Sequence, residues 1–229
     1  MMKRLAMLLT VLALDGCATT AERPAVADPP LLEPTTAEIA SLRADLAEMF
    51  VARGAFDAAL PLLQEALRLA PRSARIHTLL GIVLRDRGVY AQAEQELKLA
   101  LELEPGRASA LSALGVLYDQ EHRFEDAEQA HRDAVARARD CVKCWNNLGF
   151  SLFLERRDRA AIEAYEIALR LDPGARVIYN NLGFAYGRLG YEAAALRAFR
   201  QAGDEKRAQK NLALCRLLRA RESRRKEAQ

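Results

Sequence analysis

The 229-residue sequence has little cysteine, proline or glycine, and few aromatic residues. Four cysteines are too few for a disulfide framework, so folding must depend on the burial of apolar side chains. The histidines His77, His122 and His131 have no cysteine or carboxylate neighbour at the spacing of a metal site, and His77 and His131 are interpreted as packing residues. There is no glycine-rich phosphate loop and no serine in a glycine-flanked turn. We therefore expect no enzyme, no cofactor and no bound metal. A formal net charge of +3 gives no indication of nucleic-acid binding.

Residues 1–16 have the pattern of a secretion signal. Lys3 and Arg4 precede an uncharged apolar run of about ten residues, half of the roughly 20 that a membrane-spanning helix needs. The run lies between Leu5 and Leu14. We expect this segment to be removed from the folded protein.

The signal ends in Gly16 and Cys17, which resemble a bacterial lipobox, where the cysteine is diacylated and becomes the first residue of the mature chain. Asp15 departs from the small neutral residue usual in that pattern, so we expect slow processing. The alternative is an ordinary signal peptide that is cut near Ala18. Residues 17–36 hold half of the chain's eight prolines and show no apolar periodicity. Such a segment is expected to be a tether between a lipid anchor and a folded domain.

An internal repeat defines the rest of the chain. At an offset of 34 residues, three columns contain only alanine or glycine, an agreement that composition alone would give about once in a billion trials. The columns are Ala47, Gly81, Gly115, Gly149 and Gly183; Ala59, Ala93, Ala127, Ala161 and Ala195; and Ala66, Ala100, Ala134, Ala168 and Ala202. This period is typical of a helical repeat array.

Together with the large residues between them, these columns resemble the tetratricopeptide repeat (TPR). Its most literal copies are Trp145-x-x-Leu148-Gly149, Leu182-Gly183-x-x-Tyr186 and Ala195-x-x-x-Phe199-x-x-Ala202. The resemblance covers residues 40–209. It implies an all-α fold, a right-handed superhelix of about five helical hairpins over residues 37–205. A capping helix and a basic tail are expected over residues 206–229.

Glycine marks most of the turns within hairpins. Gly54, Gly88 and Gly190 are expected to adopt the left-handed conformation that ends a helix. His122 and Arg156 occupy the same column in repeats three and four, so we expect those two turns to be strained.

Other local patterns predict helix ends and packing. Thr35 and Glu38 have the spacing of a capping box. Pro61 is expected in the first turn of its helix, where a missing amide costs little. One column is expected to fill the core between hairpins: Leu46, Leu80, Leu114, Leu148 and Leu182. The final helix, from Lys206 to about Arg221, is expected to bury Leu212, Leu214, Cys215 and Leu218.

Cys141 and Cys144 form a candidate disulfide. They lie at a junction that has Arg139 where other junctions have a proline. In an oxidising periplasm, a disulfide would stiffen this loop. Two free thiols, or a redox or metal role, are the alternatives. A redox role would need the βαβ context of thioredoxin-like proteins, and a zinc site would need further ligands nearby; the sequence supplies neither.

TPR geometry implies that the first helix of each hairpin lines a concave groove. In repeats four and five, the inward residues are predicted to bind an extended peptide: Asn146, Asn147, Phe150, Phe153, Asn180, Asn181 and Phe184. Asparagine pairs with peptide backbone and phenylalanine gives an apolar anchor. The alternative is that the asparagines brace neighbouring helices. Earlier repeats offer a more mixed lining: Arg75, Thr78, Ile82, Ser109, Ser112 and Val116. Only Arg75 and Arg188 are expected to add positive charge, so a basic clamp for C-terminal carboxylates is not predicted.

A lipid-anchored TPR array resembles the outer-membrane lipoproteins of type IV and Tad (Flp) pilus biogenesis. The resemblance implies a scaffold whose partners are envelope, pilus or secretion proteins, and not nucleic acid or a small-molecule substrate. Ala18 is not the aspartate that retains many such lipoproteins in the inner membrane, so we expect the outer membrane, with the repeats in the periplasm. A periplasmic redox or metal-binding protein that uses Cys141 and Cys144 is the alternative function.

Overall fold

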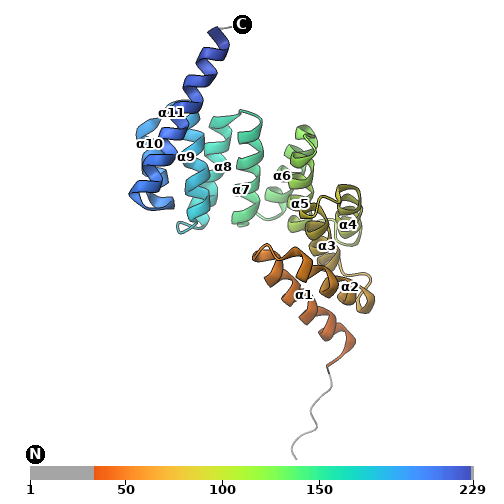
Figure 1. Cartoon of the computed structure of the whole chain (residues 1–229). Helices are drawn as coiled ribbons and strands as arrows, with labels where there is room; N and C mark the ends of the chain where they lie inside the picture. The colour runs from red at the N-terminus through yellow and green to blue at the C-terminus, as the bar shows by residue number, and fades with distance from the viewer. Residues whose placement is uncertain (1–33, 228–229) are drawn as a thin grey trace, which may run out of the picture. The chain divides into compact units, whose positions relative to one another are not determined.

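The computed structural model describes residues 34–227 of the chain, and Figure 1 shows their arrangement. The predicted signal, Cys17 and most of the predicted tether lie outside the described residues. Within residues 34–227 there are eleven α-helices and no strands, so the predicted all-α TPR-type fold is confirmed. None of these helices combines the length and the hydropathy that a membrane span requires.

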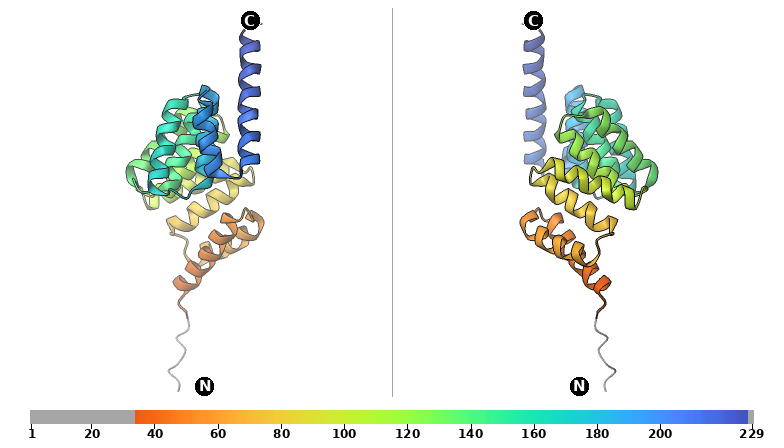
Figure 2. Two further views of the ribbon diagram at one scale, coloured as in Figure 1. Left: turned by 90° about the vertical axis from the view of Figure 1, so that its left-hand side faces the viewer. Right: turned by 90° about the vertical axis from the view of Figure 1, so that its right-hand side faces the viewer.

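Ten of the helices form five consecutive hairpins, followed by one long helix. The hairpins are α1 (Thr36–Ala52) with α2 (Phe56–Leu69), α3 (Ala74–Asp86) with α4 (Tyr90–Leu103), α5 (Ala108–Gln120) with α6 (Phe124–Arg137), α7 (Val142–Leu154) with α8 (Asp158–Leu171), and α9 (Arg176–Leu189) with α10 (Glu192–Ala202). The last helix, α11 (Glu205–Glu227), packs on α9 and α10. Figures 1 and 2 show α1 and α11 at opposite ends of this array.

The glycine column allows the two helices of a hairpin to lie close together. A Cβ atom at Gly115 would lie 2.6 Å from the ring of His131, and one at Gly149 would lie 2.7 Å from the ring of Tyr165. Real Cβ atoms do not approach side chains this closely, because protein interiors are already close-packed. In these hairpins the large residue on the second helix therefore fits only against a glycine on the first helix, whereas the first hairpin packs Leu63 with Ala47 in that column.

The leucine column fills the core in four repeats and fails in the first. Leu80, Leu114, Leu148 and Leu182 are 6% or 7% exposed, whereas Leu46 is 43% exposed. Each first helix from α3 onward packs on the second helix of the preceding hairpin. No described hairpin precedes α1, so the prediction that Leu46 is a core residue is wrong.

The turns follow the predicted pattern. Gly54, Gly88 and Gly190 have φ values of 72°, 77° and 85°, and His122 and Arg156 share this conformation with φ values of 59° and 66°. Side chains with a Cβ rarely adopt it, and the conformation costs about 1–2 kcal/mol per residue. The predicted strain at His122 and Arg156 is therefore present.

Helix starts and ends differ from the prediction in one place. Thr35 and Glu38 form the predicted capping box. Pro61, however, lies inside α2, well after its first residue Phe56, so its missing amide interrupts the helix ladder. The prediction that Pro61 lies in the first turn is wrong, because α2 already begins at Phe56, five residues before the proline.

The final helix is longer and less buried than predicted. It continues past Arg221 to Glu227, through residues that include no proline or glycine. Leu212 and Cys215 are buried, as expected, but Leu214 and Leu218 are exposed. Ala208 completes the buried face of α11, because it lies about one helical turn before Leu212 and about two turns before Cys215.

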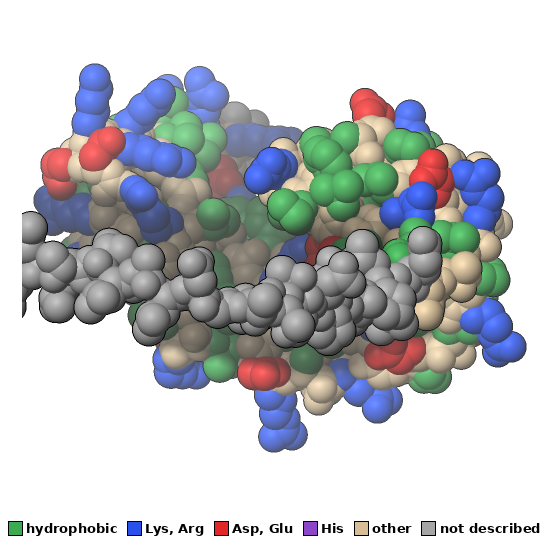
Figure 3. Space-filling view, turned by 90° about the horizontal axis from the view of Figure 1, so that it is seen from below, with side chains coloured by type: hydrophobic (Ala, Val, Ile, Leu, Met, Phe, Trp, Pro, Cys, Tyr) green, Lys and Arg blue, Asp and Glu red, His purple; other side chains and the backbone are tan. Residues whose placement is uncertain are grey.

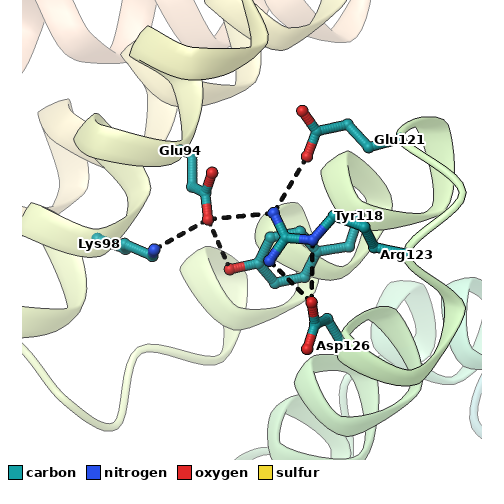
Figure 4. A network of polar contacts seen from close by, with 6 residues as sticks. All are labelled: Glu94, Lys98, Tyr118, Glu121, Arg123 and Asp126. Carbon is teal, nitrogen blue, oxygen red and sulfur yellow. Dashed lines mark hydrogen bonds and ion pairs between the residues drawn. The ribbon is translucent and has the colours of Figure 1, made fainter.

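A polar network joins repeats two and three (Figure 4). Glu94 on α4 accepts a hydrogen bond from the Tyr118 hydroxyl at 3.0 Å and lies 2.9 Å from the Lys98 ammonium. The Arg123 guanidinium stacks 4.0 Å from the centre of the Tyr118 ring and pairs with Asp126. The Lys98 hydrogen bond lowers the pKa of Glu94, and burial raises the pKa of Tyr118. This network adds a directional contact to the apolar contacts between the two hairpins.

Candidate functional site

Two adjoining clefts run along the first helices of repeats one to four. One of about 270 Å³ lies along α1 and α3, and the other, of about 230 Å³, lies along α3, α5 and the start of α7. Both are lined by Ile82, Ser109 and Lys143, so they form one continuous depression, which we call the groove. The predicted column residues of repeats two and three line it: Arg75, Thr78, Ile82, Ser109, Ser112 and Val116.

The groove is more basic than the sequence suggested. Arg85, Arg107 and Lys143 also line it, in addition to Arg75. Lys143 was recognisable from the repeat, because Arg75, Ser109 and Lys143 share one column at the 34-residue offset. Arg107 lies just before α5 and its position depends on where that helix begins. The expectation that only Arg75 adds positive charge in the early repeats is therefore wrong.

Several of these cations already have partners. Arg75 binds Asp45 at 2.7 Å and Glu48, and the Glu48 hydrogen bond raises the pKa of Arg75. Arg85 pairs with Asp86 at 2.8 Å. Lys143 is exposed and makes no ion pair within residues 34–227. Lys143 is thus the cation most available to a ligand in the groove.

The cysteine pair lies on the wall of the groove. The structure joins Cys141 and Cys144 in a disulfide. Cys141 caps α7, because its sulfur accepts a hydrogen bond from the Cys144 amide at 3.1 Å. The indole of Trp145 donates to the Arg139 carbonyl at 2.9 Å, which fixes the same loop. Cys215 is buried and free, and burial raises the pKa of its thiol. The described residues hold no cluster of three or more His, Cys, Asp or Glu side chains that would suit a metal ion.

The four candidate asparagines form hydrogen bonds to neighbouring helices. Asn147 donates to the Ser112 hydroxyl at 3.0 Å, and Asn181 donates to Asn146 at 3.1 Å. Asn180 accepts a hydrogen bond from Asn211 of α11 at 3.0 Å. All four side chains are half-buried. These contacts are those of the bracing alternative, although Asn147 also lines the groove.

The three candidate phenylalanines have different surroundings. Phe150 is 45% exposed on α7. Phe153 lies under the Arg188 guanidinium, 3.5 Å from the centre of its ring, and Phe184 packs edge-on against the buried Phe199 at 5.0 Å. Phe153 and Phe184 also line a cavity of about 320 Å³ that α11 closes on one side. Of the three, only Phe150 is a freely accessible apolar anchor.

Two histidines have carboxylate partners that the sequence spacing did not suggest. His77 Nδ1 lies 2.6 Å from Glu96, and its Nε2 lies 3.0 Å from the Pro71 carbonyl. His131 lies 3.1 Å from Asp119. Each partner lies on another helix, 19 residues from His77 and 12 residues from His131, so the spacing of a metal site in the sequence did not indicate it. Both rings are almost completely buried, so they are packing residues.

Asp119 links three helices in the core. It accepts a hydrogen bond from the Ser151 hydroxyl of α7 at 2.7 Å and faces His131 of α6. The serine contacts the carboxylate and not the imidazole, and both Ser151 and His131 are 0% exposed. A nucleophilic serine needs a neighbouring base and access to substrate, so this cluster is structural.

Figure 3 shows one face of the molecule. Lys and Arg side chains project over it, with acidic and apolar side chains between them. No single sign of charge covers the described part of this face, in agreement with the small net charge. Binding therefore depends on local contacts and not on a broad electrostatic field.

Models of the tetratricopeptide repeat match residues 44–110, 107–140, 142–175 and 177–209. Together these matches span most of the chain, and the last three each follow one helical hairpin. The protein therefore belongs to the tetratricopeptide-repeat family. No curated protein matches the sequence significantly.

Several solved TPR structures are similar in fold. PilF of Pseudomonas aeruginosa is 20% identical with a TM-score of 0.64, covering 81% of this chain and 92% of its own. MamA of Desulfovibrio magneticus RS-1 is 23% identical with a TM-score of 0.57, covering 76% and 99%. YrrB, described as a TPR protein with an unusual peptide-binding site, is 18% identical with a TM-score of 0.53, covering 76% and 90%. Identities this low show a common fold and no common partner.

Proposed function

We propose that this protein is a lipid-anchored scaffold of the bacterial outer membrane that holds extended segments of envelope proteins in its groove. The observation that carries the proposal is the continuous groove along α1, α3, α5 and α7. It combines the exposed hydroxyl of Ser109 with the apolar Ile82 and the cation of Lys143, which has no ion-pair partner in residues 34–227. Serine hydroxyls pair with peptide backbone, and Lys143 favours a segment with acidic side chains.

The direction of the groove supports an extended ligand. It passes four successive first helices, and an extended chain advances about 3.3 Å per residue. A helix is about 10–12 Å wide with its side chains, so we expect three or four ligand residues to cross each repeat. The exposed Phe150 on α7 would then anchor a side chain near the end of the groove.

Membrane attachment rests on the sequence alone. The positive residues, the short apolar run and Cys17 together suit a lipoprotein signal, and the proline-rich segment after it suits a tether. Ala18 in place of aspartate favours the outer membrane. We propose that the repeats face the periplasm, where a disulfide such as Cys141–Cys144 persists.

Assembly of a pilus or a secretion complex is the proposed role. The lipoprotein signal followed by a TPR array resembles the architecture of pilus-biogenesis lipoproteins, and PilF is among the proteins of similar fold. The chemistry required of such a protein is to hold a partner segment without reacting with it, and the groove contains donors, acceptors and apolar contacts for this purpose.

Site-specific photocrosslinking tests the proposal. A photoreactive amino acid is placed at Lys143 in the groove or at Phe150, seven residues further along α7, and, as the control, at Leu99 on the second helix α4, which is also exposed. Intact cells are irradiated and crosslinked proteins are identified by mass spectrometry. We expect the same envelope protein from Lys143 and from Phe150, joined through one extended segment. Equal capture from Leu99, or capture of different proteins at each position, would refute groove binding.

The redox alternative is separated by a second experiment. Serine at both Cys141 and Cys144 keeps an N-cap oxygen and removes the disulfide. The scaffold function survives this double substitution, so crosslinking from Phe150 should be retained. Loss of function with intact folding would instead favour thiol chemistry at Cys141, which is half-buried on the groove wall.

A further inference from the structure

The two terminal helices of the array share one feature. Each buries one face in the array and leaves an apolar stripe on the opposite face. On α1 the buried residues are Ala40, Ala44 and Ala47, and the exposed stripe is Leu42, Leu46 and Met49. On α11 the buried residues are Ala208, Leu212 and Cys215, and the exposed stripe is Leu214, Leu217 and Leu218.

The stripes are continuous because of their spacing. Residues four and seven apart lie on one face of a helix, which places Leu42, Leu46 and Met49 in line on α1, and Leu214 and Leu218 beside Leu217 on α11. Leu42 is 63% exposed and Met49 is 54% exposed. A repeat array usually ends in helices with a polar outer face, which keeps it soluble. In this array neither end does so, and exposed apolar stripes of this kind indicate a contact surface.

The charges beside the two stripes are opposite in sign. Glu38 and Asp45 lie along one side of the stripe on α1, and Arg43 on its other side is paired with Glu65 at 2.8 Å. The corresponding flanks of α11 are basic: Lys210, Arg221, Arg224 and Arg225. Glu38, Asp45 and these four bases are exposed. Asp45 is also paired with Arg75 at 2.7 Å, whereas none of the four bases forms an ion pair within the described residues. The bases that do hold α11 in place, Arg216 and Arg219, bind Glu192 on another side of the helix.

From these observations we infer that α11 of one copy docks on α1 of another, so that the protein associates head to tail. Every first helix from α3 onward packs on the second helix of the preceding hairpin, and in this contact α11 of another copy would fill the same place beside α1. It would bury Leu46, as Leu80, Leu114, Leu148 and Leu182 are buried in the later repeats. Contact between two α1 helices would bring acidic flanks together, and contact between two α11 helices would bring basic flanks together. Like charges repel each other, so the contact of α11 with α1 is favoured over a contact between two identical helices.

Head-to-tail contacts use two different surfaces and do not close on themselves unless the geometry forms a ring. Each copy therefore has one free donor surface on α11 and one free acceptor surface on α1. Association should continue beyond the dimer as the concentration rises. A row of tethered scaffolds would present many grooves along one line.

Sedimentation velocity on complementary variants tests the inference. Every described core residue lies within the compact unit that begins at Pro34, so a chain of residues 34–229 keeps all of the described packing. The wild-type chain should grow past the dimer between about 1 and 100 μM, the range of weak association. Leu46→Asp or Leu217→Asp alone should weaken association at least about tenfold, because each places an unpaired charge in the contact. Val177→Asp, at a 70% exposed residue of α9, is the matched control and should associate as the wild type does.

A mixture gives the sharpest result. Leu46→Asp retains a working α11, and Leu217→Asp retains a working α1. An equimolar mixture should therefore form dimers and nothing larger. Met49→Asp with Leu214→Asp repeats the experiment at independent positions, and circular dichroism checks that each variant is folded.

Other outcomes would overturn the inference. If Leu217→Asp associates normally while Leu46→Asp does not, the contact joins two α1 helices; the reverse result means two α11 helices. A wild-type chain that remains monomeric at roughly 100 μM ends the proposal, because a specific contact should be populated at that concentration. If that monomer binds anionic phospholipid vesicles and Leu217→Asp abolishes binding, the α11 stripe is a membrane surface instead.

The full chain is tested in isolated envelopes. A carbodiimide joins carboxylates to amines without a spacer, so it should link Glu38 or Asp45 of one copy to Lys210 of another. Mixing ¹⁵N-labelled and unlabelled copies identifies links between chains. If residues 34–229 associate but the full chain gives no such link, the segment before Pro34 prevents the contact and the inference fails for the full chain.

Discussion

The guanidinium of Arg156 binds both carboxylate oxygens of Glu222 at 2.8 Å, across 66 residues of sequence. The pair connects the turn of repeat four with the C-terminal helix, beside the cavity that Phe153 and Phe184 line. Arg156 holds this position in a left-handed conformation that three other repeats fill with glycine. The ion pair is partly exposed, and such pairs contribute about 0–1 kcal/mol. The backbone strain, about 1–2 kcal/mol, is larger, so the ion pair offsets only part of it.

Glycine and alanine at position 156 should therefore differ. Arg156→Ala removes the ion pair and keeps the strain, and we expect it to lower the free energy of unfolding by about 0.5–1 kcal/mol. Arg156→Gly also relieves the strain, worth about 1–2 kcal/mol before the entropy that glycine adds to the unfolded chain. It should be at least as stable as the wild type. Urea denaturation gives both values, with Glu222→Gln as the control that removes the pair alone. If the Arg156→Ala protein is as stable as the Arg156→Gly protein, the turn is not strained.

His131 should resist replacement by the leucine that fills its column in repeat two. His131→Leu leaves the buried Asp119 with Ser151 as its only described partner, and an unsatisfied buried polar group costs about 1–3 kcal/mol. We expect the combined variant His131→Leu with Asp119→Leu to recover part of that loss. Thermal denaturation of the single and double variants measures the coupling. Additive losses would show that the histidine and the aspartate are independent.

Stability should depend on Glu94 in a defined pH range. Its pKa is lowered from the usual 4.5, first by the Lys98 hydrogen bond, so the folded protein favours the carboxylate. This stabilisation is complete above the pKa of Glu94 in the unfolded chain, about 4.3. It disappears as the pH falls through the lower pKa that Glu94 has in the folded protein. Glu94→Gln should be less stable than the wild type at pH 7, and the difference should shrink below about pH 4. Denaturation between about pH 3 and pH 7 tests this, with the exposed Glu125→Gln as the control. A difference that is constant with pH would contradict it.

The disulfide should contribute modestly to stability. Cys141 and Cys144 are three residues apart, and the chain-entropy model gives about 2 kcal/mol for so short a loop. Reduction should therefore lower the free energy of unfolding by about 2 kcal/mol or less, since Trp145 still binds the Arg139 carbonyl. Mass spectrometry after alkylation without reduction should find Cys141 and Cys144 linked and Cys215 unlinked. Loss of folding on reduction would show that the loop depends on the bond.

Lipidation is tested in cells. Radioactive palmitate should label the wild type and not Cys17→Ala, and Asp15→Ala should speed processing, because it restores a small neutral residue to the proposed lipobox. Fractionation should place the labelled chain in the outer membrane. Label retained by Cys17→Ala would exclude acylation at this residue.

The sequence was sufficient for features that repeat or that depend on neighbouring residues. The columns that contain Gly115 and Gly149 predicted the hairpins, and the Thr35 capping box predicted the first helix start. It was insufficient where the environment comes from distant residues. Leu46 shares a pattern with Leu80, but only the end of the array exposes it. The Asp119 contacts and the Arg156 pair with Glu222 join separate helices, and no local spacing indicates them. Arg107 joins the groove lining from just before α5, so its place there depends on where that helix begins.

The asparagines decide how far the predicted binding surface extends into repeats four and five. Asn147 and Asn181 each donate a hydrogen bond to the preceding repeat, through Ser112 and Asn146. A typical hydrogen bond contributes about 0.5–1.5 kcal/mol, so Asn147→Ala with Asn181→Ala should lower the free energy of unfolding by about 1–3 kcal/mol if both residues brace helices. Ser112→Ala should then add little to Asn147→Ala, because both remove the same bond. Phe150→Ala should leave stability nearly unchanged, since that ring is exposed, and should reduce capture of the partner.

Thermal melts and photocrosslinking from Lys143 on the same variants separate the two roles. Bracing predicts reduced stability with crosslinking retained at low temperature. An asparagine pair that binds ligand directly predicts the reverse, an unchanged melt with crosslinking lost. In that case the hydrogen bonds seen between the helices are exchanged for bonds to the partner, and the binding surface continues from the groove through repeat five.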